Sequence, residues 1–138
     1  MERYKVFIDT NIPIYASGRN HPNKNLSLKI LEDISKNRIF GITSVEVFQE
    51  LLYRFHSLNM FNKGIEVFEG FYNIVDEVLP VNFQIVKNAR LIMEKNSEIN
   101  TRDAIHAATI NYYNIPYIAT FDKHFNIFKN IKNYLYSK

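Results

Sequence analysis

Short apolar segments of strand length alternate along this chain with longer segments of helical periodicity, and this alternation limits the fold more than any other feature. Apolar runs typical of strands occupy residues 4–8, 38–42, 77–81, 116–119 and 131–136, the last as an edge strand. Helical patterns occupy residues 24–36, 43–57, 61–75, 83–95 and 102–113. Strands that alternate with helices predict an α/β fold with a parallel sheet and right-handed crossovers.

Size and composition are those of one globular domain. The chain has 138 residues, 46% of them hydrophobic, and is predicted to form a single domain over residues 1–138. The lack of cysteine excludes a disulfide framework, a thiolate metal site and a thiol nucleophile. No apolar stretch approaches the roughly 20 residues of a membrane span, and the N-terminus lacks the apolar core of a signal peptide, so we expect a cytoplasmic protein.

The chain is mildly basic. Its 17 basic and 14 acidic residues give a net charge of +3. This balance is compatible with a polyanionic partner. The basic residues are dispersed and form no basic tail, so the charge alone does not identify that partner.

Two aspartates follow two of the predicted strands. Asp9 ends the apolar run in YKVFIDTN, and Asp122 lies just past residues 117–119 in YIATFDKHF. In an open parallel sheet, ligands bind beyond the carboxyl ends of the strands, where the strand order reverses. Both acids are therefore expected at that edge. Each acid taken alone is also compatible with a turn or a helix N-cap.

Two further acids belong to predicted helices. Asp103 falls in the first turn of its helix, with Thr101 as the expected N-cap, and stabilisation of the helix dipole would explain it. Glu50 lies inside a helix, where an ion pair with Arg54 at i+4 is the alternative explanation. Neither position indicates a catalytic role without the other acids.

A third helical acid, Glu46, lies one turn before Glu50. The segment Thr43-Ser44-Val45-Glu46 has the spacing of a capping box, in which the side chains of the first and last residues bond to the helix terminus. That role accounts for Glu46, so we discount it as a catalytic group and prefer Glu50.

Taken together, the acids predict a metal site. Carboxylates that converge repel each other and raise each other's pKa, and a divalent cation relieves that repulsion. Carboxylates without cysteine, and with few histidines, suit a hard ion such as Mg²⁺ or Mn²⁺. Such sites act on phosphate esters, because the metal activates a water and stabilises charge on the leaving oxygen.

Four segments in sequence carry a resemblance to a known family: VFIDTNIPIY, ITSVEVFQELLYRF, RDAIHAATI and YIATFDKHFNIF. With them the chain resembles a PIN-domain ribonuclease of the VapC-like toxin type over essentially its whole length. The resemblance implies a three-layer α/β/α sandwich around a mostly parallel sheet. It implies that the acids that bind metal and catalyse are Asp9, Glu50, Asp103 and Asp122. Asn11 and Thr120 match supporting residues. Asn126 stands where many relatives carry a further Asp, so a second metal ion is less expected than a first.

The resemblance implies a Mg²⁺-dependent endoribonuclease, with Mn²⁺ as a possible substitute, that leaves 5′-phosphate and 3′-hydroxyl ends. Its partners would be RNA, a small antitoxin that blocks the site and a second copy of the chain. The expected dimer surface is the helix at 61–75, with an apolar stripe that includes Phe61, Phe68, Phe71 and Tyr72. The candidate RNA contacts are three basic residues that lie near the expected site in sequence, Arg19, Lys24 and Lys123.

Other functions remain open at this point. One alternative is a PIN nuclease of RNA maturation that has no antitoxin, and another is an RNA-binding module without activity. A phosphoryl-transfer enzyme with Asp9 as nucleophile is disfavoured, because its Asp-x-Asp pattern would need an acid where Asn11 stands.

His106, three residues after Asp103, is expected to pack or to support the acids. The remaining histidines show no partner spacing and are expected at the surface: His21, His56 and His124.

Overall fold

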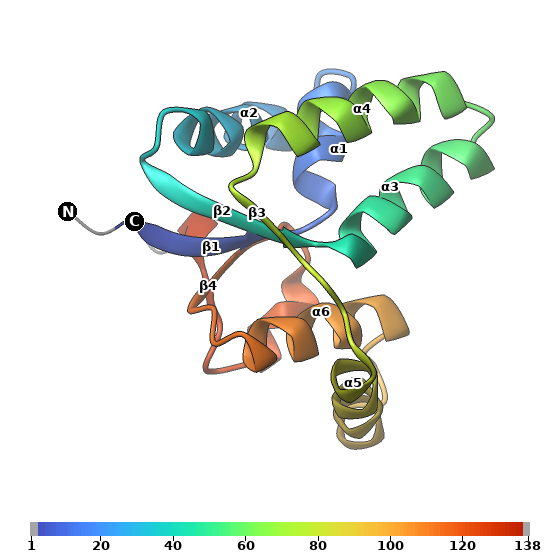
Figure 1. Cartoon of the computed structure of the whole chain (residues 1–138), viewed down its shortest axis with the longest axis vertical. Helices are drawn as coiled ribbons and strands as arrows, with labels where there is room; N and C mark the ends of the chain where they lie inside the picture. Colours follow the sequence, from blue (N-terminus) through green and yellow to red (C-terminus); the bar gives the residue numbers. More distant parts are fainter. Residues whose placement is uncertain (1–2, 137–138) are drawn as a thin grey trace.

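The computed structural model describes residues 3–136 and confirms the α/β fold. Its sheet has five strands, all parallel, in the order β3-β2-β1-β4-β5 (Figure 1). The strands are β1 (Tyr4–Ile8), β2 (Ile39–Ser44), β3 (Glu77–Leu79), β4 (Tyr117–Ala119) and β5 (Lys132–Asn133). The helices are α1 (Asn11–Ser17), α2 (Pro22–Ser35), α3 (Val45–Ser57), α4 (Phe61–Ile74), α5 (Phe83–Lys95) and α6 (Thr101–Tyr112), with the short 3-10 helices η1 (Lys123–Ile127) and η2 (Tyr134–Tyr136).

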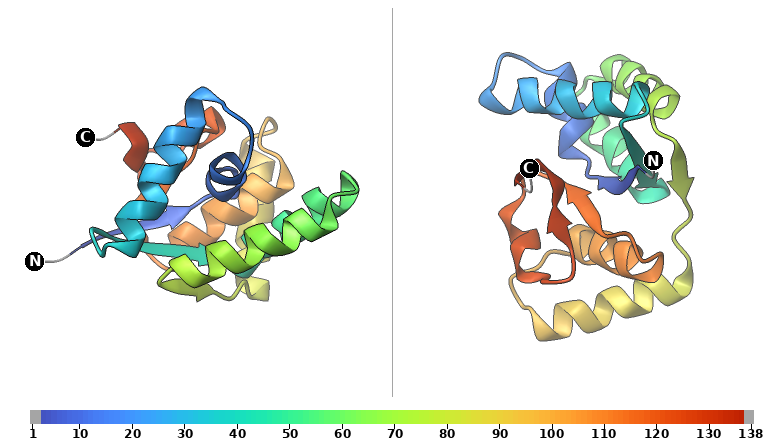
Figure 2. Two further views of the ribbon diagram at one scale, coloured as in Figure 1. Left: turned by 90° about the horizontal axis from the view of Figure 1, so that it is seen from above. Right: turned by 90° about the vertical axis from the view of Figure 1, so that its left-hand side faces the viewer.

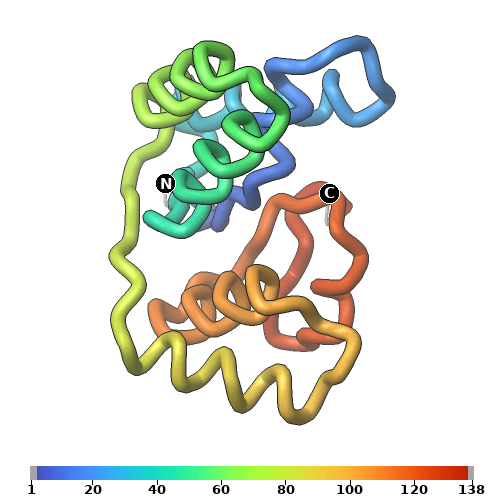
Figure 3. Tube along the Cα trace, turned by 90° about the vertical axis from the view of Figure 1, so that its right-hand side faces the viewer, coloured from blue at the N-terminus to red at the C-terminus, as the bar shows by residue number. Residues whose placement is uncertain are grey.

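Helices cover both faces of the sheet, so the molecule has three layers. The helices α1, α2 and α4 lie on one face, with α3 packed against α4, whereas α5 and α6 lie on the other (Figures 1 and 2). Because both faces are covered, the central strand β1 ends in the fully buried residues Val6, Phe7 and Ile8 and does not alternate. The strand β3 and the segment after it carry the chain from one helical layer to the other (Figure 3). Within residues 3–136, no helix has the length and apolar character that crossing a membrane would require.

The strand order reverses beside β1. This strand pairs with β2 on one side and with β4 on the other, although β4 follows much later in the chain. In the second pairing Ile8 aligns with Ala119, and the backbone N–H of Asp9 donates to the carbonyl of Ala119 at 3.1 Å. The residues that follow β1 and β4 therefore lie next to each other at the carboxyl edge of the sheet.

The predicted capping box of α3 is wrong. Thr43 and Ser44 still belong to β2, so the helix begins two residues later than predicted. The hydroxyl of Thr43 donates to the carbonyl of Ile8 at 3.1 Å and ties β2 to β1. Ser44 occupies the N-cap position without a side-chain cap bond. A capping box therefore does not account for Glu46.

Other element boundaries differ in small ways. The N-cap of α6 is Asn100, whose side chain accepts from the N–H of Asp103 at 2.8 Å, and Thr101 is the first helical residue. The expected last strand shortens to β5, since only two of its residues pair with β4. The short helix α1 was not predicted, because its seven residues are too few to show a helical period.

Two glycines of α4 provide a test of how closely α3 and α4 pack. A methyl group at Gly70 would meet no atom within 4 Å, whereas one at Gly64 would lie 2.7 Å from Cβ of Phe55. Alanine is favoured over glycine in a helix interior by roughly 0.5–1 kcal/mol. We therefore expect Gly70→Ala to raise the free energy of unfolding by that amount. We expect Gly64→Ala to lower it by about 1–3 kcal/mol, as overpacked cores do. Urea unfolding measures both, and equal stabilisation would contradict the close contact.

Candidate active site

Four acids from four separate elements line one cavity of about 510 Å³. Asp9 follows β1, Glu50 comes from α3, Asp103 from the first turn of α6, and Asp122 follows β4. All four are the acids that the sequence singled out, and the reversal of strand order beside β1 places two of them. The cavity lies at the edge of the sheet where this class of fold binds its ligands.

Asp9 is held in a fixed orientation by neutral hydrogen-bond donors. Its Oδ1 accepts from the N–H of Thr10 at 2.7 Å, and its Oδ2 accepts from the hydroxyl of Thr120 at 2.6 Å. The side-chain amide of Asn11 donates both to Oδ2 of Asp9, at 3.3 Å, and to the hydroxyl of Thr120, at 3.2 Å. The carboxyl of Asp9 is buried, and burial raises its pKa above the ordinary value of 3.8. Asn11 thus contacts the acid that it was expected to support, and Thr120, whose partner the sequence left open, contacts the same acid.

Glu50 is paired with a buried histidine. The Nε2 atom of His106 lies 2.6 Å from Oε1 of Glu50 and 3.8 Å from Oδ1 of Asp9. Burial by itself lowers the pKa of His106. The hydrogen bond with Glu50 and the charge of Asp9 outweigh burial, and together they raise the pKa of His106 above 6.5. His106 therefore links two of the four acids through one nitrogen atom.

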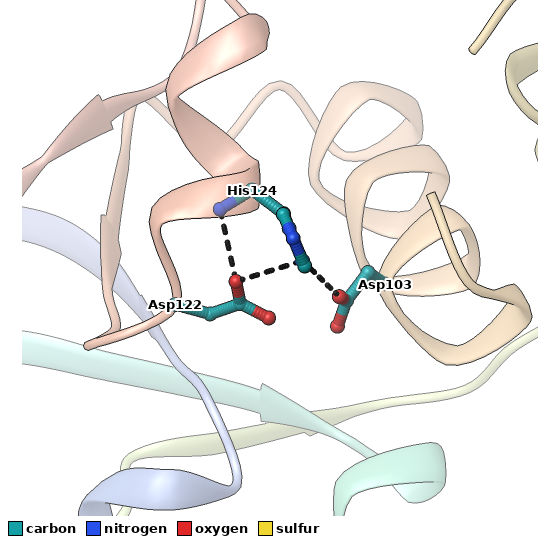
Figure 4. A group of neighbouring side chains, drawn as sticks. All are labelled: Asp103, Asp122 and His124. Atoms are coloured by element: carbon teal, nitrogen blue, oxygen red, sulfur yellow. Dashed lines mark hydrogen bonds and ion pairs between the residues drawn. The ribbon is translucent and has the colours of Figure 1, made fainter. Parts of the chain in front are cut away.

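Asp103 and Asp122 face each other with less support. The side chain of Asp122 accepts from the N–H of His124 at 2.9 Å and caps η1 (Figure 4). The Oδ2 atom of Asp103 is buried and has no hydrogen-bond partner among the described residues. Burial and the neighbouring carboxyl of Asp122 raise the pKa of Asp103 to about 7. Two carboxyls this close hold one proton more readily than two negative charges.

Several residues near the cavity were not anticipated. Arg54 and Arg102 both line it, as does Tyr53. Their signals in the sequence are modest: Arg54 lies one helical turn after Glu50, and Arg102 precedes Asp103. The ion pair between Glu50 and Arg54 that the sequence left open does not form among residues 3–136.

Other predicted residues lie outside the cavity lining. Among them are the exposed Asn126 and the three basic residues Arg19, Lys24 and Lys123. Glu46, which was discounted as a catalytic group, does not line the cavity either. The ammonium group of Lys24 donates to the carbonyl of Gly18 at 2.7 Å. His124 is exposed, as expected, but its ring lies near the carboxyls of Asp122 and Asp103, which its position in the sequence did not indicate.

The donor set fits a divalent cation. The cavity offers carboxylate oxygens and no sulfur, which is the chemistry that Mg²⁺ and Mn²⁺ select. The unpartnered oxygen of Asp103 and the raised pKa of its carboxyl are the signs of negative charge without compensation. A cation held there would supply that compensation.

Comparison with known proteins identifies the family of the chain. The model of the PIN domain family matches residues 6–131. A VapC ribonuclease of Mycobacterium bovis is 30% identical over 127 residues, which cover 92% of this chain and 97% of that protein. The chain belongs to the PIN domain family. The family that the four sequence segments indicated is thereby confirmed.

Solved structures share the fold of this PIN domain at low identity. The VapC20 toxin of Mycobacterium tuberculosis superposes with a TM-score of 0.73 at 14% identity, covering 88% of this chain and 93% of that one. A toxin–antitoxin complex from Klebsiella pneumoniae contains a chain with a TM-score of 0.63 at 16% identity, covering 91% and 94%. The predicted three-layer α/β/α architecture is confirmed.

The raised pKa of Asp103 predicts how stability depends on pH in the absence of metal. The folded chain holds this proton up to about pH 7, whereas the ordinary pKa is 3.8, so folding gains a proton between these values. The stability contributed by Asp103 is therefore present below about pH 4 and is lost as the pH rises through 7. The variant Asp103→Asn does not lose stability in this way, because the amide of asparagine does not titrate.

We expect Asp103→Asn to be more stable than the wild type at pH 8 in EDTA, with the difference shrinking as the pH falls and largely gone near pH 4. Urea unfolding at several pH values measures this difference, and titrating groups far from Asp103 cancel between the two proteins. A difference that stays constant with pH would show that the carboxyl of Asp103 is not strained by its surroundings. Adding Mg²⁺ or Mn²⁺ should stabilise the wild type more than the variant.

Proposed function

We propose that this PIN domain is an endoribonuclease that uses a divalent metal ion, Mg²⁺ or Mn²⁺, to hydrolyse RNA phosphodiester bonds. The observation that carries the proposal is the convergence of Asp9, Glu50, Asp103 and Asp122, from four separate elements, on one cavity. A relative that is 30% identical over nearly its whole length is named a ribonuclease, which supports the same activity.

In this proposal Asp9 and Asp122 are the main metal ligands, directly or through water. When bound, the metal supplies an activated water and stabilises negative charge on the leaving oxygen. Glu50 and Asp103 complete the cluster and position the water. His106, held 2.6 Å from Glu50, fixes the direction of that carboxylate. Attack by water at phosphorus leaves a 5′-phosphate and a 3′-hydroxyl.

The walls of the cavity suit a negatively charged chain. Arg54 from α3 and Arg102 from α6 stand on the lining next to the acids, so their guanidinium groups are placed to bind phosphates that flank the cleaved bond. Tyr53 is 63% exposed and offers a ring on which an unpaired base can stack. Arg19, Lys24 and Lys123 remain candidate contacts farther along the RNA.

We further infer that the protein is the toxin of a toxin–antitoxin pair. The support is the shared family and fold, which include VapC proteins and a toxin–antitoxin complex. In this proposal a small antitoxin covers the cavity and blocks RNA. A nuclease of RNA maturation has the same acids, so the presence of a neighbouring antitoxin gene separates the two functions.

A homodimer is also part of the proposal, with a revised surface on α4. Phe71 was expected in the dimer stripe but is only 2% exposed and belongs to the core, where its ring lies 5.4 Å from that of Phe48. The exposed apolar residues that remain on this helix are Phe61, Ile65 and Tyr72. Size measurements in solution test this assembly.

The first test of the activity compares wild type with Asp9→Asn on a mixed pool of RNA. We expect the wild type to cleave RNA with Mg²⁺ or Mn²⁺ and to stop in EDTA. We expect Asp9→Asn to reduce cleavage to background, because the substitution removes a ligand charge from the centre of the site. Glu69→Gln, which changes an exposed acid on α4 outside the cavity, is the matched control and should cleave normally.

Each outcome of that comparison has a distinct meaning. Cleavage that survives in Asp9→Asn would reject the site and point to a contaminating nuclease. Metal binding without cleavage of the pool would favour an enzyme restricted to one RNA. Absence of both would favour the RNA-binding module without activity.

The arginines on the cavity wall give a second prediction. In an Asp9→Asn background with Mg²⁺, RNA stays intact and its binding can be followed by fluorescence anisotropy at increasing salt. Loss of one phosphate contact should reduce the slope of log affinity against log salt by about 0.7. We expect this change for Arg54→Gln and Arg102→Gln. Arg90→Gln, whose side chain pairs with Glu94 on α5, is the control and should leave the slope unchanged. Equal slopes in all variants would place the RNA elsewhere.

A further inference from the structure

The side chain of His124 reaches two of the acids from η1 (Figure 4). Its Nδ1 lies 3.2 Å from Oδ1 of Asp122 and 3.9 Å from Oδ2 of Asp103. One ligand atom from each of the three side chains lies within 4.8 Å of the other two. Two oxygens and one nitrogen therefore surround one small volume at the side of the cavity.

These separations are those of ligands that share an ion. For metal–ligand distances of about 2.1 Å, two ligands lie roughly 3.0 Å apart at a right angle and roughly 4.2 Å apart on opposite sides. The distances of 3.2 and 3.9 Å both fall in that interval. The longer distance is too long for a hydrogen bond, and the shorter one lies at the long end of the range for one.

A second observation independently points to a ligand at the same place. The side chain of Asp103 is only 10% exposed, yet its Oδ2 has no hydrogen-bond partner among residues 3–136. This is the same oxygen atom that faces His124. A buried carboxylate oxygen without a donor is costly, and a cation placed between it and the imidazole would remove that cost.

We propose that His124 is a nitrogen ligand of the metal that the four acids hold, bound on the side of Asp103 and Asp122, and that this ligand makes the site prefer Mn²⁺ to Mg²⁺. The inference rests on the proposed function for the presence of a metal and adds the identity of one ligand and the choice of ion. Mg²⁺ is bound almost entirely through oxygen, whereas imidazole is a ligand of transition-metal ions, and carboxylates suit Mn²⁺ as well.

The exposure of His124 fits this role. Its side chain is 58% exposed, so the ring can turn toward an ion without repacking the core. By contrast His106, the other histidine near the acids, is 1% exposed and directs Nε2 at Glu50. The two histidines therefore face different acids from different sides, and their nitrogens can be distinguished by substitution.

The test uses Mn²⁺ itself as the spectroscopic reporter on the intact protein. Electron spin echo envelope modulation detects ¹⁴N coupled to bound Mn²⁺, and isothermal titration measures the affinities for Mn²⁺ and Mg²⁺ separately. We expect ¹⁴N modulation in the wild type and its loss in His124→Ala. We expect the same variant to lower Mn²⁺ affinity by about tenfold or more while changing Mg²⁺ affinity much less.

Two further variants sharpen the result. His56→Ala removes an exposed histidine of α3 that does not line the cavity, and both the modulation and the affinities should stay as in the wild type. His124→Asp replaces nitrogen by oxygen, and we expect it to shift the preference toward Mg²⁺ while abolishing the ¹⁴N signal.

The outcomes separate this inference from the proposed function. Mn²⁺ bound without ¹⁴N modulation, or modulation that persists in His124→Ala, overturns the role of His124 and leaves a metal-dependent nuclease standing. Equal loss of Mg²⁺ and Mn²⁺ affinity in His124→Ala overturns the claim about ion choice. A wild type that binds neither ion rejects the metal site and the proposed activity together.

Discussion

The repulsion between acidic side chains that share one cavity is the constraint on which the rest of the structure depends. Four carboxyl groups reach this cavity from different elements, and burial raises the pKa of Asp9 while burial and Asp122 raise that of Asp103. The metal-free fold therefore holds these groups at a cost in stability. Hydrogen bonds from Thr120 and Asn11 to Asp9 offset part of that cost. The rest of the cost is relieved when a cation binds, and this relief adds to the binding free energy of the cation.

The acids differ in how fully the protein itself supports them. Asp9 accepts several hydrogen bonds from neutral donors, and Glu50 is paired with the imidazole of His106. Asp103 keeps one buried oxygen without any donor. Because the protein itself stabilises Asp103 least, a cation is expected to bind most favourably on the side of the cavity near Asp103 and Asp122. The orientation of Asp9 and Glu50 is fixed before any ligand arrives.

The pattern of the sequence predicted the class of fold and the position of Asp9 and Asp122, because residues that follow parallel strands must share one edge of the sheet. It failed at Thr43, where a strand continues, since a threonine suits a strand end and a helix cap equally well. It also failed for the surroundings of the acids. Whether Arg102 reaches the cavity, and whether His124 reaches Asp122 and Asp103, depends on how α6 and η1 pack against the sheet. The spacing of residues in the sequence does not determine that packing.

The pairing of β1 with β4 has a consequence for synthesis. The hydroxyl that holds Asp9 belongs to Thr120, 111 residues farther along the chain, and the last acid follows two residues later. The strand β1 can therefore pair with β4, and so complete the middle of the sheet and the cavity, only after the ribosome has made the long segment between them. Contacts this distant in sequence form late and slowly. A nascent chain that has not yet reached β4 therefore has no complete candidate active site while it is still attached to the ribosome.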